Sequence, residues 1–138
     1  MDTLNVPADM DNLHTFQSFI LEKGKEMGVP AELTPRLELV MEELAVNVIS
    51  YAYPNTQGEI EIHCKLEQHE GRQRFCVQLR DWGVAFDPLS REIEEMNLDV
   101  AERPIGGLGI LFAGEMTDSL TYKRENDSNV LVFCFDFP

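Results

Sequence analysis

Two neighbouring stretches that alternate apolar and polar residues constrain the fold more than any other feature of this chain. They are GEIEIHCKLEQ, residues 58–68, and RFCVQLRD, residues 74–81. A period of two residues is typical of a β-strand with one face buried and the other in water. Because the short, turn-forming segment HEGR joins the two runs, they predict an antiparallel hairpin.

A second hairpin is predicted near the C-terminus. Its strands are SLTYKRE, residues 119–125, and NVLVFCFDF, residues 129–137, with NDS between them. The last run is apolar on both faces, which is typical of a strand in the middle of a sheet. A short strand, TLNV at residues 3–6, precedes all the other elements.

Three helices are predicted between the strands. Apolar side chains recur at helical spacing in residues 8–28, and a Gly-Val-Pro sequence ends that run. A second helix covers about residues 34–53, from a Thr-Pro pair that suits a helix start to a proline that stops it. A third is expected over about residues 107–116.

This order of elements predicts the fold class. Strand, two helices, two strands, a polar acidic segment, a helix and two strands fit an α+β protein. We expect a two-layer sandwich in which three main helices lie on one face of a mostly antiparallel, mixed sheet. A chain of 138 residues has the size of one ordinary domain, so residues 1–138 are predicted to form a single domain.

The charge of the chain restricts its partners. It carries 25 acidic and 11 basic residues, a formal charge of −14. Because affinity for nucleic acids comes largely from Lys and Arg, this balance argues against DNA or RNA as a ligand. The sequence contains neither an apolar run of the roughly 20 residues that span a bilayer nor an N-terminal signal pattern, so we expect a cytoplasmic protein with no membrane partner.

The cysteines and histidines give no sign of a metal centre. Cys64, Cys76 and Cys134 are widely spaced, each lies in an apolar strand-like run, and there is no C-x-x-C. We therefore expect three buried, reduced thiols. The three histidines have no metal-ligand spacing, so a metal held by protein side chains alone is not expected.

The first candidate site pair is Glu43 and Asn47. Four residues apart on the second predicted helix, they project from the same face, one turn from each other. A carboxylate and an amide among apolar neighbours call for partners that satisfy them. The alternative is a solvated helix edge.

The second candidate is the segment RDWGVAFDP, where Asp81 ends a strand and Gly83 follows. An aspartate there can accept a hydrogen bond from an exocyclic amine, and the glycine lets a flat ring lie close to the backbone. The alternative is an ordinary Asx turn. For Trp82, the only tryptophan, packing is favoured over a stacking role.

The third candidate is RPIGGLGI, which has three glycines in four positions before an apolar helical run. Glycine lets the backbone approach a phosphate, and a helix start offers free N–H groups to an anion. A simple turn is the alternative. Neither G-x-x-x-x-G-K-[ST] nor G-x-G-x-x-G is present.

Taken in order, MEELAVNVISYAYP, RDWGVAFDP and GGLGI resemble the ATP-binding serine kinases of the anti-sigma-factor type. These belong to the histidine-kinase-like ATPase superfamily that includes gyrase and MutL. The resemblance covers nearly the whole chain and implies a Bergerat-type ATP-binding fold, with an ATP lid at about residues 88–106. It also implies ATP and Mg²⁺ as cofactors.

The resemblance implies a role for each motif. Asn47 would coordinate the Mg²⁺ that bridges the ATP phosphates, Glu43 would be the general base, and Asp81 would hydrogen-bond the adenine amino group. Gly83 would make room for the adenine, and Ala85 stands where the family often has a second glycine. The residues expected to contact the phosphates are Gly106, Gly107, Leu108, Gly109 and Arg103, although Arg103 is as readily explained as a solvated charge.

The family implies a protein serine kinase that phosphorylates a STAS-type anti-sigma antagonist and alternately binds a sigma factor, often as a homodimer. Partner switching of this kind regulates transcription. The alternative is a nucleotide-regulated binding module that holds a partner without phosphotransfer, and a weaker one is a structural domain with no ligand.

Overall fold

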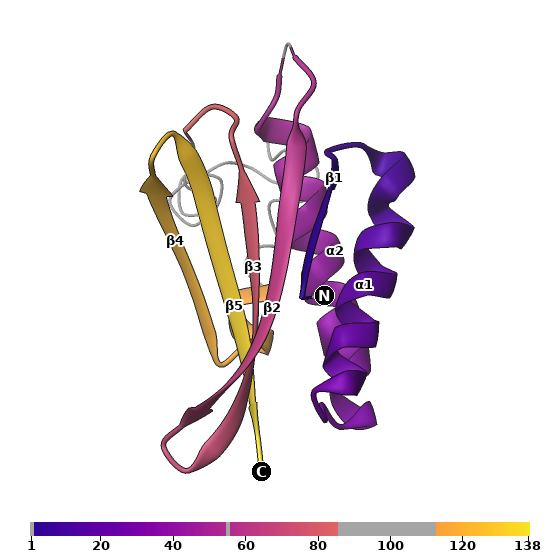
Figure 1. Ribbon diagram of the computed structural model, residues 1–138, viewed down its shortest axis with the longest axis vertical. Coiled ribbons are helices and arrows are strands. Elements are labelled where there is room, and N and C mark those ends of the chain that lie inside the picture. Colours follow the sequence, from indigo (N-terminus) through magenta and orange to yellow (C-terminus); the bar gives the residue numbers. More distant parts are fainter. Residues whose placement is uncertain (1, 55, 86–112) are drawn as a thin grey trace, which may run out of the picture.

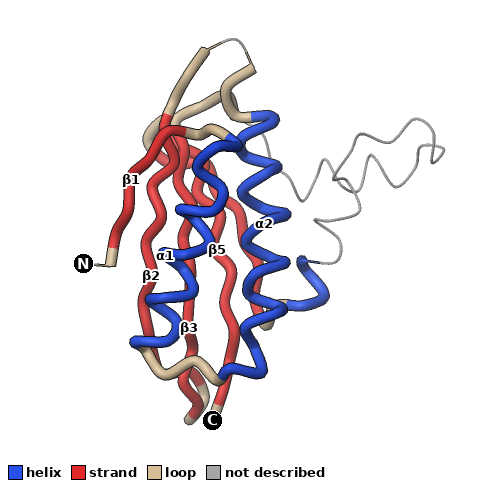
Figure 2. The backbone as a smooth tube through the Cα atoms, turned by 90° about the vertical axis from the view of Figure 1, so that its right-hand side faces the viewer, coloured by secondary structure: helices blue, strands red, loops and turns tan. Residues whose placement is uncertain are grey.

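The computed structural model describes residues 2–54, 56–85 and 113–138. Within them the chain forms two layers: a five-stranded sheet, and two helices that lie side by side across one of its faces (Figures 1 and 2). The strands are β1 (Thr3–Pro7), β2 (Glu59–His69), β3 (Arg72–Asp81), β4 (Ser119–Glu125) and β5 (Ser128–Phe137). The helices are α1 (Leu13–Glu26) and α2 (Thr34–Tyr51), each preceded by a 3₁₀ turn, Met10–Asn12 and Ala31–Leu33.

The strand order is β1-β2-β3-β5-β4, and all four pairings between the described strands are antiparallel. The predicted α+β two-layer fold is confirmed, and so is the inner position of β5, which lies between β3 and β4. β5 is buried on both faces along most of its length. Its apolar sequence therefore reflects its place between two strands, with the helices over one face.

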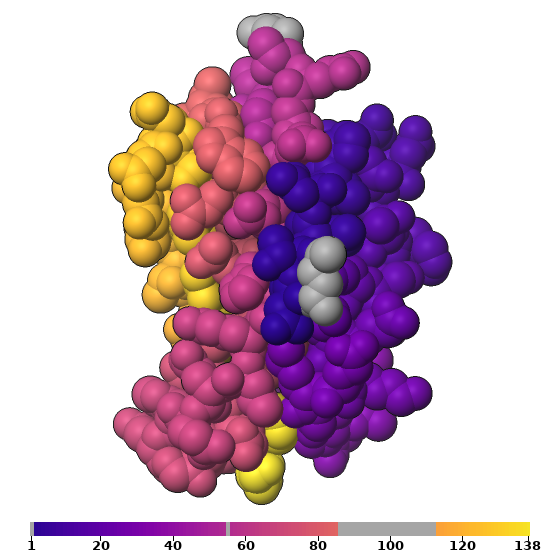
Figure 3. All heavy atoms as spheres, viewed as in Figure 1, coloured from indigo at the N-terminus to yellow at the C-terminus, as the bar shows by residue number. Residues whose placement is uncertain are grey.

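Both predicted hairpins form, and each closes with a two-residue turn. Glu70 and Gly71 have φ of 51° and 79°, and Asn126 and Asp127 have φ of 49° and 61°. Two consecutive residues with positive φ are typical of a type I′ turn, whose twist matches that of the flanking strands. The turn end of the β2–β3 hairpin projects beyond the helices, at the lower left of Figure 3.

The helix boundaries differ from the predicted ones at the ends. α1 begins at Leu13 rather than near residue 8, because Asp9 accepts a hydrogen bond from the Asp11 N–H and caps a separate 3₁₀ turn. At its other end, Gly28 takes the positive φ of 89° that glycine adopts freely. α2 begins at Thr34 as predicted. Of the third predicted helix, residues 113–116 are helical, and its start, like the predicted lid, lies outside the described residues.

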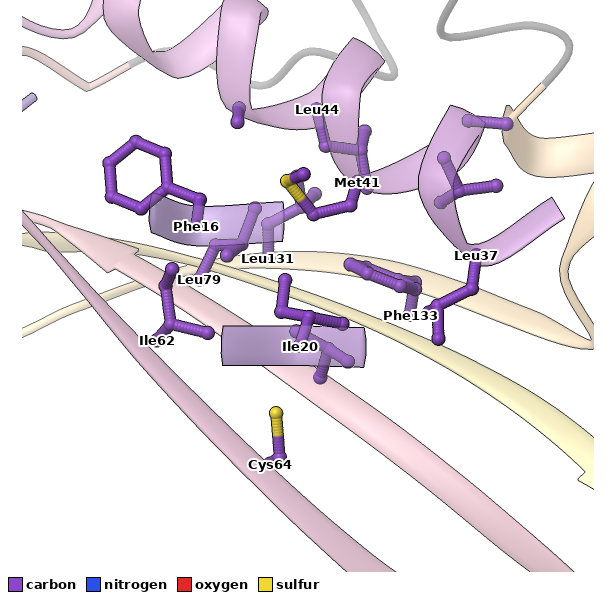
Figure 4. Close-up of a cluster of buried hydrophobic side chains, with 14 of the residues drawn as sticks. Phe16, Ile20, Leu37, Met41, Leu44, Ile62, Cys64, Leu79, Leu131 and Phe133 are labelled. Carbon is purple, nitrogen blue, oxygen red and sulfur yellow. The ribbon is translucent and has the colours of Figure 1, made fainter. Parts of the chain in front are cut away.

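The core lies between the two helices and the inner face of the sheet (Figure 4). α1 contributes Phe16 and Ile20, and α2 contributes Leu37, Met41 and Leu44, all at most 2% exposed. The sheet contributes a ladder of inward side chains from β3 and β5 that face one another in register, Phe75 with Phe135, Val77 with Phe133, Leu79 with Leu131. The next pair in this row is polar: Asp81 with Asn129.

The prediction of three reduced cysteines is wrong for two of them. Cys76 and Cys134 form a disulfide between β3 and β5, where they are directly opposite. The two residues are 58 positions apart, and only the register of the two strands brings them together. Cys64, on the inner face of β2, is a buried free thiol, as predicted.

Among the described residues, no helix combines the length and the apolar character needed to cross a bilayer.

Candidate functional site

Asp81 is the centre of a polar cluster where β3 ends. Its side chain lies on the same face as the core residues of β3 and is only 2% exposed. One carboxylate oxygen, Oδ1, accepts hydrogen bonds from the Gly83 N–H and from Asn129 Nδ2, both at 2.9 Å. Burial raises the pKa of the Asp81 carboxyl, and the hydrogen bonds from Asn129 and Gly83, together with the charge of Arg124, oppose that shift.

The bond from the Gly83 N–H makes the segment an Asx turn, the alternative weighed for this motif. This turn uses only Oδ1. Within the described parts of the chain no donor reaches the other oxygen, Oδ2, so the Asx turn and a ligand at Oδ2 are compatible.

The turn after β3 is fastened to the end of α2. The Val84 N–H donates to the Ala52 carbonyl at 2.8 Å, and the Trp82 N–H donates to the Tyr53 hydroxyl at 2.8 Å. A Cβ at Gly83 would lie 2.0 Å from the Ala52 carbonyl oxygen. The absence of a side chain at position 83 is therefore required by the contact between the turn and α2, whether or not a ligand binds.

Glu43 and Asn47 lie on the helix that this turn contacts. Both are half-buried, beside the buried residues Leu44 and Val48. Burial raises the pKa of the Glu43 carboxyl, and the neighbouring charge of Glu42 raises it further. A fully solvated helix edge does not describe these two positions. Asn47 lies five residues before Ala52, the residue to which the turn is bonded, and five residues correspond to about 7.5 Å along a helix axis.

An open cavity of ≈ 760 Å³ adjoins the same turn. Its lining includes Tyr53, Gly58, Trp82 and Val84, but not Glu43, Asn47 or Asp81. Trp82 is 44% exposed there and lines the cavity. Its backbone N–H donates to the Tyr53 hydroxyl.

The remaining predicted site residues divide into two groups. Ala85 follows the turn and is exposed. Arg103, Gly106, Gly107, Leu108 and Gly109 lie outside the described residues. In the part of the chain that the structure describes, no group of three or more His, Cys, Asp or Glu side chains could hold a metal ion.

Sequence reasoning missed Asn129 and Tyr122. Asn129 is 3% exposed, and its Oδ1 accepts a hydrogen bond from the Tyr122 hydroxyl at 2.6 Å. One signal was available in the sequence. Asn129 is a polar residue at the start of a largely apolar strand, and pairing the strands in register places it opposite Asp81.

Comparison with known proteins identifies the family of this chain. Residues 6–135 match the model of the histidine kinase-like ATPase domain. The chain belongs to this family. Two curated relatives are named serine-protein kinase RsbW. The one from Bacillus cereus (strain ATCC 10987 / NRS 248) is 23% identical over 133 residues, and the one from Bacillus thuringiensis (strain Al Hakam) is 22% identical over 133 residues.

Each alignment covers 94% of this chain and 81% of the relative. The resemblance stated from the three motifs is thus confirmed at the level of the ATPase family and of its serine-kinase relatives. Within this ATPase family, the cluster around Asp81 and the Glu43–Asn47 face of α2 are the described parts of the candidate nucleotide site.

Proposed function

We propose that this histidine kinase-like ATPase domain is an ATP-binding serine protein kinase. The observation that carries the proposal is the buried Asp81 carboxylate: one oxygen is held by two hydrogen bonds, and no donor from the described residues reaches the other. An exocyclic amine such as that of adenine is a donor of the required kind. The serine-kinase names of the relatives support the reaction class.

The phosphate end of the nucleotide is assigned to α2 and to the glycine-rich segment. In the proposal Asn47 offers its amide oxygen, a hard ligand of the type Mg²⁺ prefers, while Arg103, Gly106, Gly107, Leu108 and Gly109 contact the phosphates. When bound, Mg²⁺ neutralises charge on the phosphates. Gly83 and Ala85 border the base.

Glu43 is the proposed general base. A serine hydroxyl attacks the γ-phosphorus, the bond from that phosphorus to the bridging oxygen breaks, ADP leaves, and the hydroxyl proton passes to the Glu43 carboxylate. Half-burial and the charge of Glu42 raise the Glu43 pKa, and a raised pKa makes the carboxylate a better proton acceptor. The same shift means that the base is lost by protonation at a higher pH than for an exposed glutamate.

The proposed substrate is a serine on a STAS-type anti-sigma antagonist, and the proposed second partner is a sigma factor, bound by a homodimer in the cytoplasm. The formal charge of −14 favours docking onto a basic surface of such partners. A phosphate added to the antagonist would weaken its docking on an acidic face by repulsion.

The test is transfer of label from ATP to a purified antagonist-type partner. We expect labelling by the parent, loss of at least a hundredfold in rate with Glu43→Gln, and little change with the matched control Glu42→Gln, an exposed neighbour on the same helix. Tight complex formation without label in the parent would favour the nucleotide-regulated binding module. Equal rates for the parent and Glu43→Gln would contradict the assigned base.

A second measurement concerns Asn47. The affinity of the parent for ATP should rise with added Mg²⁺, and Asn47→Ala should remove this increase. Ser50→Ala, an exposed position one turn away on the same helix, is the control and should leave it intact. An Asn47→Ala variant with the magnesium dependence of the parent would contradict the proposed ligand.

A further inference from the structure

Asn129 is buried and polar, and the roles proposed above do not account for its side-chain amide. Its Nδ2 donates to Asp81 Oδ1 at 2.9 Å and to the Val84 carbonyl at 2.8 Å. Its Oδ1 accepts from the Tyr122 hydroxyl at 2.6 Å. The side chain, only 3% exposed, therefore connects β3, the turn after it, and β4.

These contacts fix the orientation of the amide. Nδ2 faces two acceptors and Oδ1 faces a donor, so a half-turn of the amide would set its oxygen against the Asp81 carboxylate and the Val84 carbonyl. Buried acceptors that face one another without a proton between them are costly. Asn129 is thus held as a donor toward Asp81.

A donor at this point controls what Asp81 can do for a ligand. Ionised aspartate only accepts hydrogen bonds, whereas protonated aspartate can also donate one. Hydrogen bonds to Oδ1 favour the ionised form and leave Oδ2 as the free acceptor among the described contacts. An acceptor at Oδ2 fits an amino group on a purine ring, and a protonated Oδ2 would instead fit a carbonyl group.

We infer that Asn129 is a positioning residue that holds the Asp81 carboxylate with Oδ2 available as an acceptor. It thereby makes the site selective for a purine with an amino group at C6 over one with a carbonyl group there. This inference rests on the proposed function, because it concerns the base of the same nucleotide. It adds a residue that touches Asp81 rather than the nucleotide.

The charged and titratable groups around Asp81 come from β4 and from the segment that follows α2. Arg124 of β4 donates to the Gly83 carbonyl at 3.0 Å and lowers the Asp81 pKa by its charge. Burial raises the pKa of the Tyr53 hydroxyl, which accepts from the Trp82 N–H, and the Tyr122 hydroxyl of β4 donates to Asn129. Burial of Asp81 acts in the opposite direction to Arg124 and raises the Asp81 pKa. Removal of the Asn129 donor should therefore raise the Asp81 pKa further.

The test compares dissociation constants for ATP and for inosine triphosphate, which carries a carbonyl at C6, at pH 6 and pH 8 with fixed Mg²⁺. Asn129→Leu keeps the approximate size of the side chain and removes both donors. We expect Asn129→Leu to reduce the preference for ATP at least tenfold, with the larger reduction at the lower pH, because a raised Asp81 pKa favours the protonated carboxyl there. Asn5→Leu, the same change at an exposed position of β1, should leave the preference unchanged.

Other variants separate positioning from simple support of the fold. Asn129→Ser retains a hydroxyl donor and should restore part of the preference. Tyr122→Phe removes the bond to the amide oxygen but keeps the Asn129 amide donor, so it should cause a smaller loss. A role limited to the fold predicts that both nucleotides lose affinity equally, with the same ratio at both pH values. If Asn129→Leu does not fold, the inference is tested with Asn129→Ser and Tyr122→Phe, by the same ratio of dissociation constants.

Two outcomes would overturn the inference, and they can be distinguished. If Asp81→Asn abolishes the preference for ATP while the Asn129 and Tyr122 variants retain it, the nucleotide site stands and the role of Asn129 is refuted. If the parent shows no shift of its melting temperature with Mg-ATP and no measurable affinity, the proposed function and this inference fall together.

Discussion

Gly83→Ala tests the contact between the turn after β3 and the end of α2 in the absence of any ligand. The added methyl carbon would lie 2.0 Å from the Ala52 carbonyl oxygen, 2.5 Å from its carbon and 2.8 Å from the Ala52 Cβ. Two of these three atoms are backbone, so no side-chain rotation relieves the overlap. The turn must move away from α2, and the 2.8 Å bond from Val84 to the same oxygen is lost.

The expected loss of unfolding free energy in Gly83→Ala has two contributions. Overpacking that forces a backbone shift costs about 1–3 kcal/mol, and a lost hydrogen bond costs about 0.5–1.5 kcal/mol. We expect Gly83→Ala to lower the free energy of unfolding by roughly 2–4 kcal/mol, a large part of the 5–15 kcal/mol that is usual for a domain. Urea denaturation of the nucleotide-free protein, followed by circular dichroism, measures the difference directly.

Gly24→Ala is the matched control. Gly24 lies in α1, and a Cβ there would make ordinary contacts, the nearest at 3.5 Å to Leu37. Alanine is the better helix former, so this change should stabilise the protein by about 0.5–1 kcal/mol. The same chemical change is thus expected to have opposite signs at the two positions. Unchanged stability of Gly83→Ala without nucleotide would refute the argument and leave only a ligand to explain the glycine.

Two further predictions concern the other face of the sheet. Arg74 and Asp136 form a two-fold ion pair at 2.6 and 3.0 Å, and the hydrogen bond and charge of Arg74 lower the Asp136 pKa below its usual value. The stability from this ion pair is present above the unfolded-state pKa of Asp136 and is lost as the pH falls through the folded-state pKa. Asp136→Asn should therefore lower the unfolding free energy by about 1 kcal/mol at pH 7 and by progressively less below about pH 4. An equal loss in urea titrations at pH 7 and pH 3 would contradict this. Reduction of the Cys76–Cys134 disulfide, which closes a loop of 58 residues, should lower the unfolding free energy of the parent by roughly 2–4 kcal/mol. Dithiothreitol should not change the stability of a variant with serine at both positions, and the reasoning fails if the parent is equally insensitive.

Much of the fold follows from local patterns. The alternating runs predict β2 and β3, and the all-apolar run predicts the inner position of β5, because the side-chain pattern of a strand records which of its faces are covered. The ends of α1 were harder to predict. Asp9 caps a 3₁₀ turn before the helix, and a cap of this kind has the same sequence signature as a helix start.

The parts that sequence reasoning missed depend on contacts across the sheet. Cys76 meets Cys134, and Asp81 meets Asn129, through one register between β3 and β5. A shift of one residue would separate both pairs, and no local pattern records that register. Gly83 illustrates the same limit. Its place in the motif was evident, but the demand for a missing side chain comes from Ala52, which lies 31 positions earlier in the chain.

The Cys64 thiol allows local opening of the core to be measured without an introduced label. With Cys76 and Cys134 bonded to each other, it is the only thiol of a chain that has three cysteines, and it lies beneath α1 on the inner face of β2. Burial raises the pKa of this thiol to about 12, so an alkylating reagent at neutral pH finds almost no thiolate and no path to the sulfur. The rate of alkylation therefore measures how often the inner face of β2 becomes exposed, without any introduced label.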